Sequence, residues 1–116
     1  MTGRAISQGD TVPAEDAAAL FRSAWSERLF LDHVLAAARD RNWLAYHTWR
    51  SDHSPSGFPD LVMVRLSRVI WAELKSEKGS VTDDQQVWLD ALETSGQREV
   101  YVWRPSMWDE IVKKLT

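Results

Sequence analysis

The sequence predicts a single α/β domain in which four short strands are flanked by helices. Three observations support this prediction. Apolar residues recur at helical spacing over 26–41 and again over 82–94. Apolar runs at 61–64 and 69–74 enclose a polar turn, which is typical of a β-hairpin, and the alternating segment 99–104 adds a further strand. With 116 residues and 44% hydrophobic content, the chain supports one modest core.

The first part of the chain, residues 1–22, mixes Gly, Ser, Thr, Pro and acids with one Ala-rich segment, Ala14 to Phe21. We expect a flexible leader there, with at most a turn or two of helix docking on the domain. The domain itself is expected to span 23–116.

The first long helix is expected from Ser26 to about Arg41. Ser26 suits the N-cap position, and Glu27 follows it at the positive end of the helix. Glu27 also falls on the apolar stripe that should face the sheet, so a helix-dipole role and a site role both stay open. Residues 43–49, WLAYHTW, predict the first strand, and the turn-rich segment 50–57 predicts a loop leading into the hairpin.

The open end of the hairpin gathers charged residues. Glu73 and Lys75 are two apart and therefore share a face of the second strand. An even-numbered turn at 66–67 or 67–68 would place Asp60 opposite Glu73 or Lys75, about 5 Å away on the same face. An odd-numbered turn would direct Asp60 to the other face unless a bulge restored it.

Two carboxylates beside a backbone carbonyl suit Mg²⁺, a hard cation that takes oxygen ligands and retains waters and phosphate oxygens. A neighbouring lysine can orient a water and stabilise negative charge at phosphorus, so the cluster has the parts that phosphodiester hydrolysis needs. The same residues could instead form cross-strand ion pairs on a solvated face. Against this alternative, carboxylates gathered without a cation repel one another.

These residues resemble the motif of a known superfamily. Gly57-Phe58-Pro59-Asp60, followed after a 12-residue gap by Glu73-Leu74-Lys75, resembles the PD-(D/E)XK nucleases. The continuation 80–89, SVTDDQQVWL, is similar to the VRR-NUC branch, in which a Gln follows the lysine at a helix start and is trailed by Trp-Leu. The resemblance covers about 26–111.

The resemblance implies a restriction-endonuclease-like αβββαβ core with a mixed four-stranded sheet flanked by helices. It also implies dependence on Mg²⁺ or Mn²⁺ and cleavage of duplex or branched DNA, such as Holliday junctions, in the cytoplasm of a bacterial cell or phage-infected host. The implied catalytic residues are Asp60, Glu73, Lys75 and Gln85, and the implied metal-binding residues are Glu27, Asp60, Glu73 and Leu74, the last through its carbonyl.

A junction-resolving nuclease needs two sites in paired orientation, so the resemblance also implies a homodimer. We expect its interface on the first helix or on the strand 99–104, where apolar residues could be exposed.

Two interpretations of Gln85 remain open. The run Thr82-Asp83-Asp84-Gln85 fits a capping box, in which the Gln85 side chain returns to the backbone N–H of Thr82. The resembling family places a site residue at the same Gln.

Phosphate contacts are expected from cations in the loops and connectors around the hairpin, namely Arg50, His53, Arg65, Arg68 and Lys78. The alternative function is a non-catalytic nucleic-acid-binding module that keeps the fold and uses such cations alone. A pure binding module would not need the acids and the lysine of the motif.

Composition limits the remaining classes. A net charge of −3 argues against a generic electrostatic nucleic-acid binder, although a metal-dependent nuclease is partly exempt because the cation neutralises its acidic site. The absence of Cys excludes a disulfide framework and a thiolate metal site. No apolar run spans a bilayer and no signal-peptide core begins the chain, so we expect a soluble, intracellular protein with no membrane partner.

Overall fold

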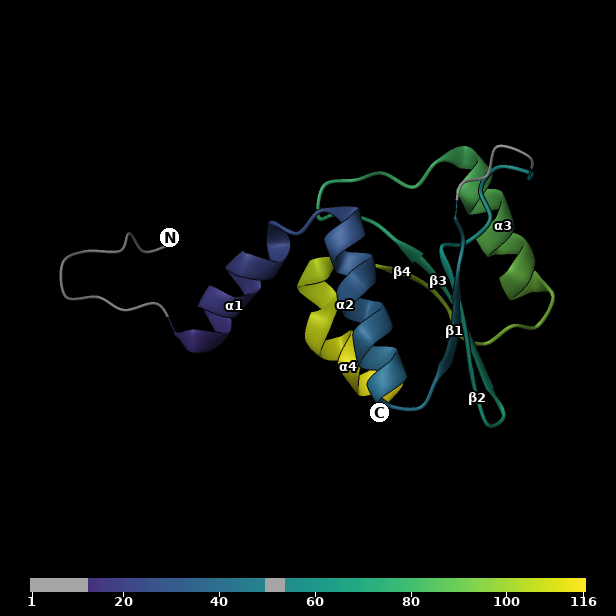
Figure 1. The fold of residues 1–116 in the computed structure, drawn as a ribbon. Helices are drawn as coiled ribbons and strands as arrows, with labels where there is room; N and C mark the ends of the chain where they lie inside the picture. Colours follow the sequence, from purple (N-terminus) through teal and green to yellow (C-terminus); the bar gives the residue numbers. More distant parts are fainter. Residues whose placement is uncertain (1–12, 50–53) are drawn as a thin grey trace.

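A computed structural model describes residues 13–49 and 54–116 (Figure 1). After one N-terminal helix, the elements follow the predicted αβββαβ order and end with a short 3-10 helix and a last α-helix. Their bounds are α1 Ala14–Ser23, α2 Glu27–Asp40, β1 Leu44–His47, β2 Leu61–Arg65, β3 Arg68–Leu74, α3 Asp83–Thr94, β4 Val100–Trp103, η1 Pro105–Met107 and α4 Trp108–Leu115.

The four strands form one mixed sheet in the order β1-β2-β3-β4. β1 and β3 both pair with β2 in antiparallel fashion, whereas β4 lies parallel to β3 after the crossover through α3. Helices α2 and α4 lie on one side of the sheet, and α3 lies on the other (Figure 1). The predicted four-stranded mixed sheet with flanking helices is confirmed.

The core lies between the sheet and the α2–α4 pair. Side chains alternate along a strand, so one face of β2 and β3 is apolar and fully enclosed while the other carries the charged residues of the motif. The stripe predicted for the first helix is confirmed at its apolar positions, because it packs on this face. The buried residues of the core include Phe30, Val34, Ala38, Leu61, Met63, Ile70, Ala72, Leu74, Trp103, Ile111 and Leu115.

The N-terminal helix is longer than the turn or two expected of the leader. α1 has ten residues, and it packs beside η1 with Arg22 3.8 Å from the carboxylate of Asp109. Its run of three alanines favours helix, and contact with the C-terminal part of the fold adds support that local sequence does not reveal. Residues 1–12 of the expected leader lie outside the described residues.

The β2–β3 hairpin has the even-numbered turn on which the site prediction depends. Arg65 pairs with Arg68, so the turn consists of Leu66 and Ser67, with Leu66 at a φ of 54°. The ladder ends with the pair Leu61–Ala72. One further step in the same register brings Asp60 opposite Glu73, as predicted.

A membrane-spanning helix would have to be much longer and more apolar than those found here. None of the helices in the described part of the chain meets that requirement.

Candidate active site

Asp60 is held in place by both neighbouring strands. Its backbone carbonyl accepts a hydrogen bond from the N–H of Thr48 at 2.8 Å, and the Thr48 hydroxyl donates to the carbonyl of Pro59 at 2.9 Å. Its side chain reaches across to β3, where the carboxylate oxygen Oδ2 accepts from the N–H of Leu74 at 2.8 Å. The carboxylate is therefore fixed at the open end of the hairpin.

Pro59 lies just before the β2–β3 ladder, whose last pair is Leu61–Ala72, and the chain bends at Asp60 between them. Proline has no N–H and cannot donate to the Leu74 carbonyl, while the Leu74 N–H is taken by Asp60 instead. The Leu74 carbonyl thus receives no strand hydrogen bond from Pro59.

Glu73 and Lys75 are both buried, with only 1% and 6% of their surfaces exposed. The Lys75 ammonium lies 3.6 Å from Oε2 of Glu73. The other oxygen of Glu73, Oε1, is buried and has no hydrogen-bond partner among the described residues. Burying a carboxylate oxygen without a hydrogen-bond partner costs free energy, because the oxygen loses its hydrogen bonds to water and gains none from the protein.

The environment of Glu73 disfavours its charged form. Burial raises its pKa to about 8, and the nearby Asp60 carboxylate adds to the rise, whereas Lys75 opposes it. Without a cation, the surroundings of Glu73 therefore favour its protonated form. A bound cation would reverse this preference by stabilising the carboxylate.

Glu27 faces this cluster from α2. It is the first residue of the helix, which Ser26 caps by accepting from the Leu29 N–H at 3.1 Å, so the helix-dipole role predicted for Glu27 applies. Glu27 also lines a cavity of about 170 Å³ together with Asp60 and Leu74.

Across residues 13–49 and 54–116, no three His, Asp or Glu side chains converge closely enough to hold a metal. Glu27 therefore stands across the cavity from the motif and does not complete a three-acid cluster.

The motif residues nevertheless suit a magnesium-type ion. Mg²⁺ is usually held by one or two carboxylates, with waters and phosphate oxygens in its remaining positions. Asp60 and Glu73 could supply two carboxylates, the carbonyl of Leu74 could supply a further oxygen, and the partnerless Oε1 of Glu73 is an atom that a cation would satisfy.

Gln85 forms the predicted capping box. Its backbone N–H donates to the Thr82 hydroxyl at 3.2 Å, and its side-chain carbonyl accepts from the Thr82 N–H at 2.9 Å. Gln85 also lines a cavity that it shares with Asp60. The structural role is confirmed, and the position next to the motif leaves the site role open.

Gly57 determines how closely the motif loop approaches α3. It has a φ of 92°, and a Cβ atom there would lie 2.5 Å from the carbonyl carbon and oxygen of Asp84. Only glycine tolerates both the left-handed backbone and this contact. The first residue of the Gly-x-Pro-Asp motif is thus explained by packing of the loop on the start of α3.

Of the predicted phosphate-contacting cations, the structure describes Lys78, Arg65 and Arg68, and these three do not gather at the site. Lys78 is exposed on the connector after β3, next to Gly79, whose Cα faces Glu27 and Lys75. Arg50 and His53 lie outside the described residues. Arg65 and Arg68 flank the turn at the opposite end of the hairpin.

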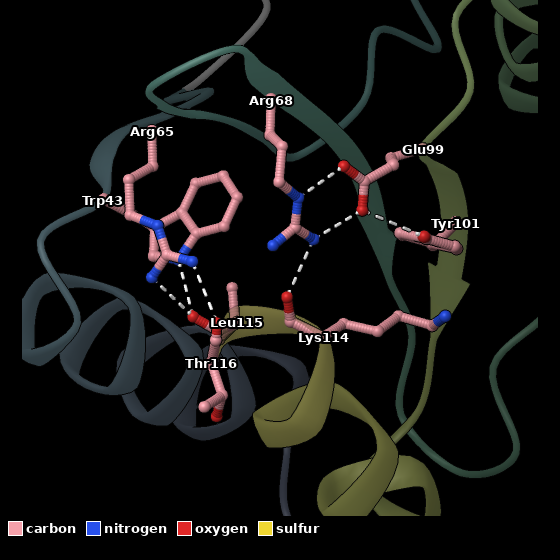
Figure 2. Close-up of polar contacts among 8 residues, drawn as sticks. All are labelled: Trp43, Arg65, Arg68, Glu99, Tyr101, Lys114, Leu115 and Thr116. Atoms are coloured by element: carbon pink, nitrogen blue, oxygen red, sulfur yellow. Dashed lines mark hydrogen bonds and ion pairs between the residues drawn. The ribbon is translucent and has the colours of Figure 1, made fainter.

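Both hairpin arginines are engaged with the protein itself (Figure 2). Arg65 lies over the Trp43 ring at 4.7 Å and donates to the carbonyls of Arg41, Leu115 and Thr116 at 2.9–3.1 Å. Arg68 forms a two-bond pair with Glu99 at 2.9 and 2.7 Å and also donates to the Lys114 carbonyl at 2.8 Å. We therefore remove Arg65 and Arg68 from the candidate phosphate contacts.

Sequence reasoning missed an aromatic cavity that adjoins Asp60. Its volume is about 530 Å³, and its lining includes Tyr46, Trp49, Phe58 and Trp88 as well as Gln85. Neither Tyr46 nor Trp88 is among the site residues predicted from the sequence. The available signal was that Tyr46 falls on the strand face opposite Trp43, Ala45 and His47, so it could not belong to the same core.

Comparison with known families gives one result. A family model described as the VRR-NUC domain matches residues 13–104, which include every element from α1 to β4 and all motif residues. The match begins earlier and ends sooner than the span of 26–111 expected from the motifs. Searches of the curated proteins and of the solved structures return no match.

Proposed function

Because the chain belongs to the VRR-NUC family of the PD-(D/E)XK nuclease superfamily, we propose that it is a metal-dependent endonuclease that hydrolyses phosphodiester bonds in duplex or branched DNA. The observation that carries this proposal is Glu73. It is a buried acid with a partnerless oxygen, facing a second carboxylate and a buried lysine. Such an arrangement is unfavourable for the fold alone and is suited to a bound cation.

We assign Asp60, Glu73 and the Leu74 carbonyl to a Mg²⁺ or Mn²⁺ ion. When bound, such an ion polarises a phosphate oxygen and activates water. Glu27, across the cavity, would act through a water molecule of the ion rather than by direct contact.

Lys75 has the role of positioning the attacking water. Its ammonium is held beside Glu73 at 3.6 Å in a site where water is largely excluded, so its charge is poorly screened. A fixed positive charge there stabilises the negative charge that develops on the phosphorus oxygens. Gln85, which shares a cavity with Asp60, is the remaining candidate in the catalytic set.

For DNA contacts we retain Lys78, and we retain Arg50 and His53 as predictions from their place in the motif loop. With a net charge of −3, the chain has no general attraction for DNA, so binding should depend on the metal ion as well as on these few cations.

A homodimer fits the exposed apolar side chains. The exposed side chains are Leu44 on β1, Val64 on the adjacent strand β2 and Leu66 in the turn that follows β2, and β1 is an edge strand. This surface differs from the first helix and the 99–104 strand, where the interface was expected. Burying such a patch in a two-fold contact would remove apolar surface from water and would pair two active sites.

The Leu44→Lys variant tests this interface, because Leu44 is 76% exposed and a charge there does not disturb the core. Light scattering should report a dimer for the unaltered protein and a monomer for Leu44→Lys. An unaltered protein that is already monomeric would contradict the dimer, and a dimeric variant would place the interface elsewhere.

The nuclease proposal is tested with purified protein, a four-way junction and a linear duplex, each incubated with Mg²⁺, with Mn²⁺ or with EDTA. Glu73→Gln is the sharpest variant. Glutamine matches the protonated carboxyl in shape and charge, so the fold should persist while a cation ligand is lost.

Glu99→Gln is the matched control, since Glu99 is a part-buried acid beside the other end of the same sheet. We expect metal-dependent cleavage that is lost in Glu73→Gln and Asp60→Asn but kept in Glu99→Gln. DNA binding without cutting under every condition would favour the non-catalytic module.

A further inference from the structure

The aromatic cavity beside Asp60 has a size and composition typical of a small-molecule site. Its volume of about 530 Å³ falls inside the range of about 300–1,000 Å³ found for ligand pockets. Side chains from β1, from the loop before β2 and from α3 surround it. Three separate segments of the chain therefore line one cavity.

Phe58 and Trp88 line the cavity and form an aromatic cluster with Trp71, which lies behind them. The ring of Phe58 packs edge-on against Trp88 at 5.0 Å and against Trp71 at 6.0 Å. Phe58 follows Gly57, whose close approach to Asp84 secures this loop against α3. The aromatic wall is thus held in place before any ligand arrives.

The mouth of the cavity carries two exposed aromatic rings. Tyr46 is 61% exposed and Trp49 is 71% exposed, although rings of this size usually bury most of their surface. Trp49 rests against His47 with ring centres 4.3 Å apart, which supports the indole from one side. Exposed aromatic rings around a hollow are the usual platform for stacking of nucleobases.

Polar groups of the lining suit the edge of a base. Gln85 uses its side-chain carbonyl for the capping box, and that box does not require its amide NH₂. The NH₂ can therefore donate to an acceptor on a ligand. Thr48 is committed to the backbone of Asp60 and Pro59, so it acts as a brace for the motif.

Asp60 connects this cavity to the catalytic cluster. It lines the aromatic cavity and also the smaller cavity that contains Glu27 and Leu74. If a phosphate binds at Asp60, Glu73 and Lys75, the nucleotide next to that phosphate lies at the mouth of the aromatic cavity. A base can enter only after leaving its stack, which is easiest for an unpaired base.

We infer that this cavity binds one unstacked nucleobase of the strand to be cut, and that the substrate class is DNA with an unpaired nucleotide next to the cleaved phosphate. The inference rests on the proposed nuclease function for its placement of the phosphate. Stacking accepts any base, so it predicts selection by DNA structure and not by sequence.

The test uses three duplexes of one sequence. The first contains an unpaired 2-aminopurine, the second an abasic residue at that place, and the third is fully paired. Affinity is measured in Ca²⁺, which takes the same class of oxygen ligands as Mg²⁺, and again in EDTA. The unpaired base should bind about 5- to 150-fold more tightly than the abasic residue, and 2-aminopurine fluorescence should fall as the base stacks.

Tyr46→Ala and Trp49→Ala should each bring the ratio of the affinities for the base and abasic duplexes toward one. Trp49→Phe should keep most of the preference for the base. Phe21→Ala is the matched control, because Phe21 is 79% exposed on α1 and lines none of these cavities. Equal binding of the base and abasic duplexes by the unaltered protein would overturn the inference, as would failure to bind any duplex in either buffer.

A parallel cleavage assay separates this inference from the nuclease proposal. Cutting in Mg²⁺ without a base-to-abasic preference would reject the base cavity and leave the nuclease. A preference abolished by Trp49→Ala, without cutting in any metal, would support the cavity and reject the enzyme.

Discussion

The two ends of the β2–β3 hairpin shift the pKa of a nearby glutamate in opposite directions. At the turn, Arg68 meets Glu99 in a two-bond pair, and that pair lowers the pKa of the Glu99 carboxyl. At the open end, burial and Asp60 raise the pKa of Glu73 to about 8, although Lys75 lies beside it. One glutamate has all the cationic and hydrogen-bonding partners it needs, and the other does not.

The difference follows from what surrounds each end. The turn lies against the C-terminus of α4, whose free carbonyls attract cations, so Arg65 and Arg68 anchor that helix to the sheet (Figure 2). At the open end, Oε1 of Glu73 has no hydrogen-bond donor among the described residues. Satisfied charge stabilises the fold, while unsatisfied charge marks a place for a ligand.

The largest expected contrast between the two ends is in catalysis. Lys75→Met should lower cleavage by at least about 100-fold, because it removes a fixed charge aimed at the reacting phosphate. Its metal affinity by calorimetry should stay close to that of the unaltered protein, whereas Asp60→Ala should lose affinity. Equal metal affinity in the two variants would contradict the division of roles.

The two ends should also give stability profiles of opposite sign with pH. Between pH about 5 and 8, the unfolded chain has an ionised Glu73 while the metal-free folded protein keeps it protonated. The free energy of unfolding in EDTA should therefore fall as pH rises through this window, on the order of a few kcal/mol. Glu73→Gln should remove that slope in urea melts, and an unchanged slope would exclude Glu73 as its source.

Glu99 should affect the free energy of unfolding at acidic pH, in contrast to Glu73. Its lowered pKa means that its contribution is present above the unfolded value of about 4.5 and is lost as pH falls through the folded value. In urea melts, Glu99→Gln should reduce the pH dependence of the unfolding free energy below pH about 4.5. It should leave the pH dependence between about 5 and 8 unchanged. A change in the upper window would contradict the assignment.

Arg68→Ala should cost about 1.5–3 kcal/mol of unfolding free energy, because it leaves the part-buried Glu99 without its charged partner. Cleavage by the folded fraction should stay normal. Arg98→Ala, a neighbouring exposed arginine, serves as the control and should have little effect on urea melts. Loss of cleavage at full stability in Arg68→Ala would restore the phosphate role that we have removed.

The smallest expected effect separates the two interpretations of Gln85. Loss of the capping box in Gln85→Ala should cost about 1 kcal/mol, measured by thermal or urea unfolding. If capping is its only role, cleavage at permissive temperature should be unchanged. Reduced cleavage at nearly normal stability would assign Gln85 to the site.

Local patterns in the sequence predicted much of this molecule. The hairpin register depends on alternation and on turn length, so an even-numbered turn predicted Asp60 opposite Glu73 or Lys75, and the observed turn at 66–67 selects Glu73. The helix cap at Ser26 and the capping box at Thr82 are also local, and both are present.

The misses involve contacts between distant segments. The Trp43 indole donates a hydrogen bond to the Leu115 carbonyl, 72 residues away in the sequence. This contact holds the end of α4 next to the hairpin turn, where the Leu115 carbonyl also accepts a hydrogen bond from Arg65. The aromatic cavity depends on the loop at Gly57 resting on α3. Neither arrangement has a periodic signature, so sequence reasoning placed two arginines on DNA and left Tyr46 unnoticed.

Pro59 affects the backbone hydrogen bonding at the open end of the hairpin. Proline has no N–H, so position 59 cannot donate a strand hydrogen bond beyond the last pair of the ladder, Leu61–Ala72. Any other residue type would bring a backbone donor to this end of the hairpin, next to Asp60. Proline thus keeps one competing hydrogen-bond donor away from the proposed metal ligands.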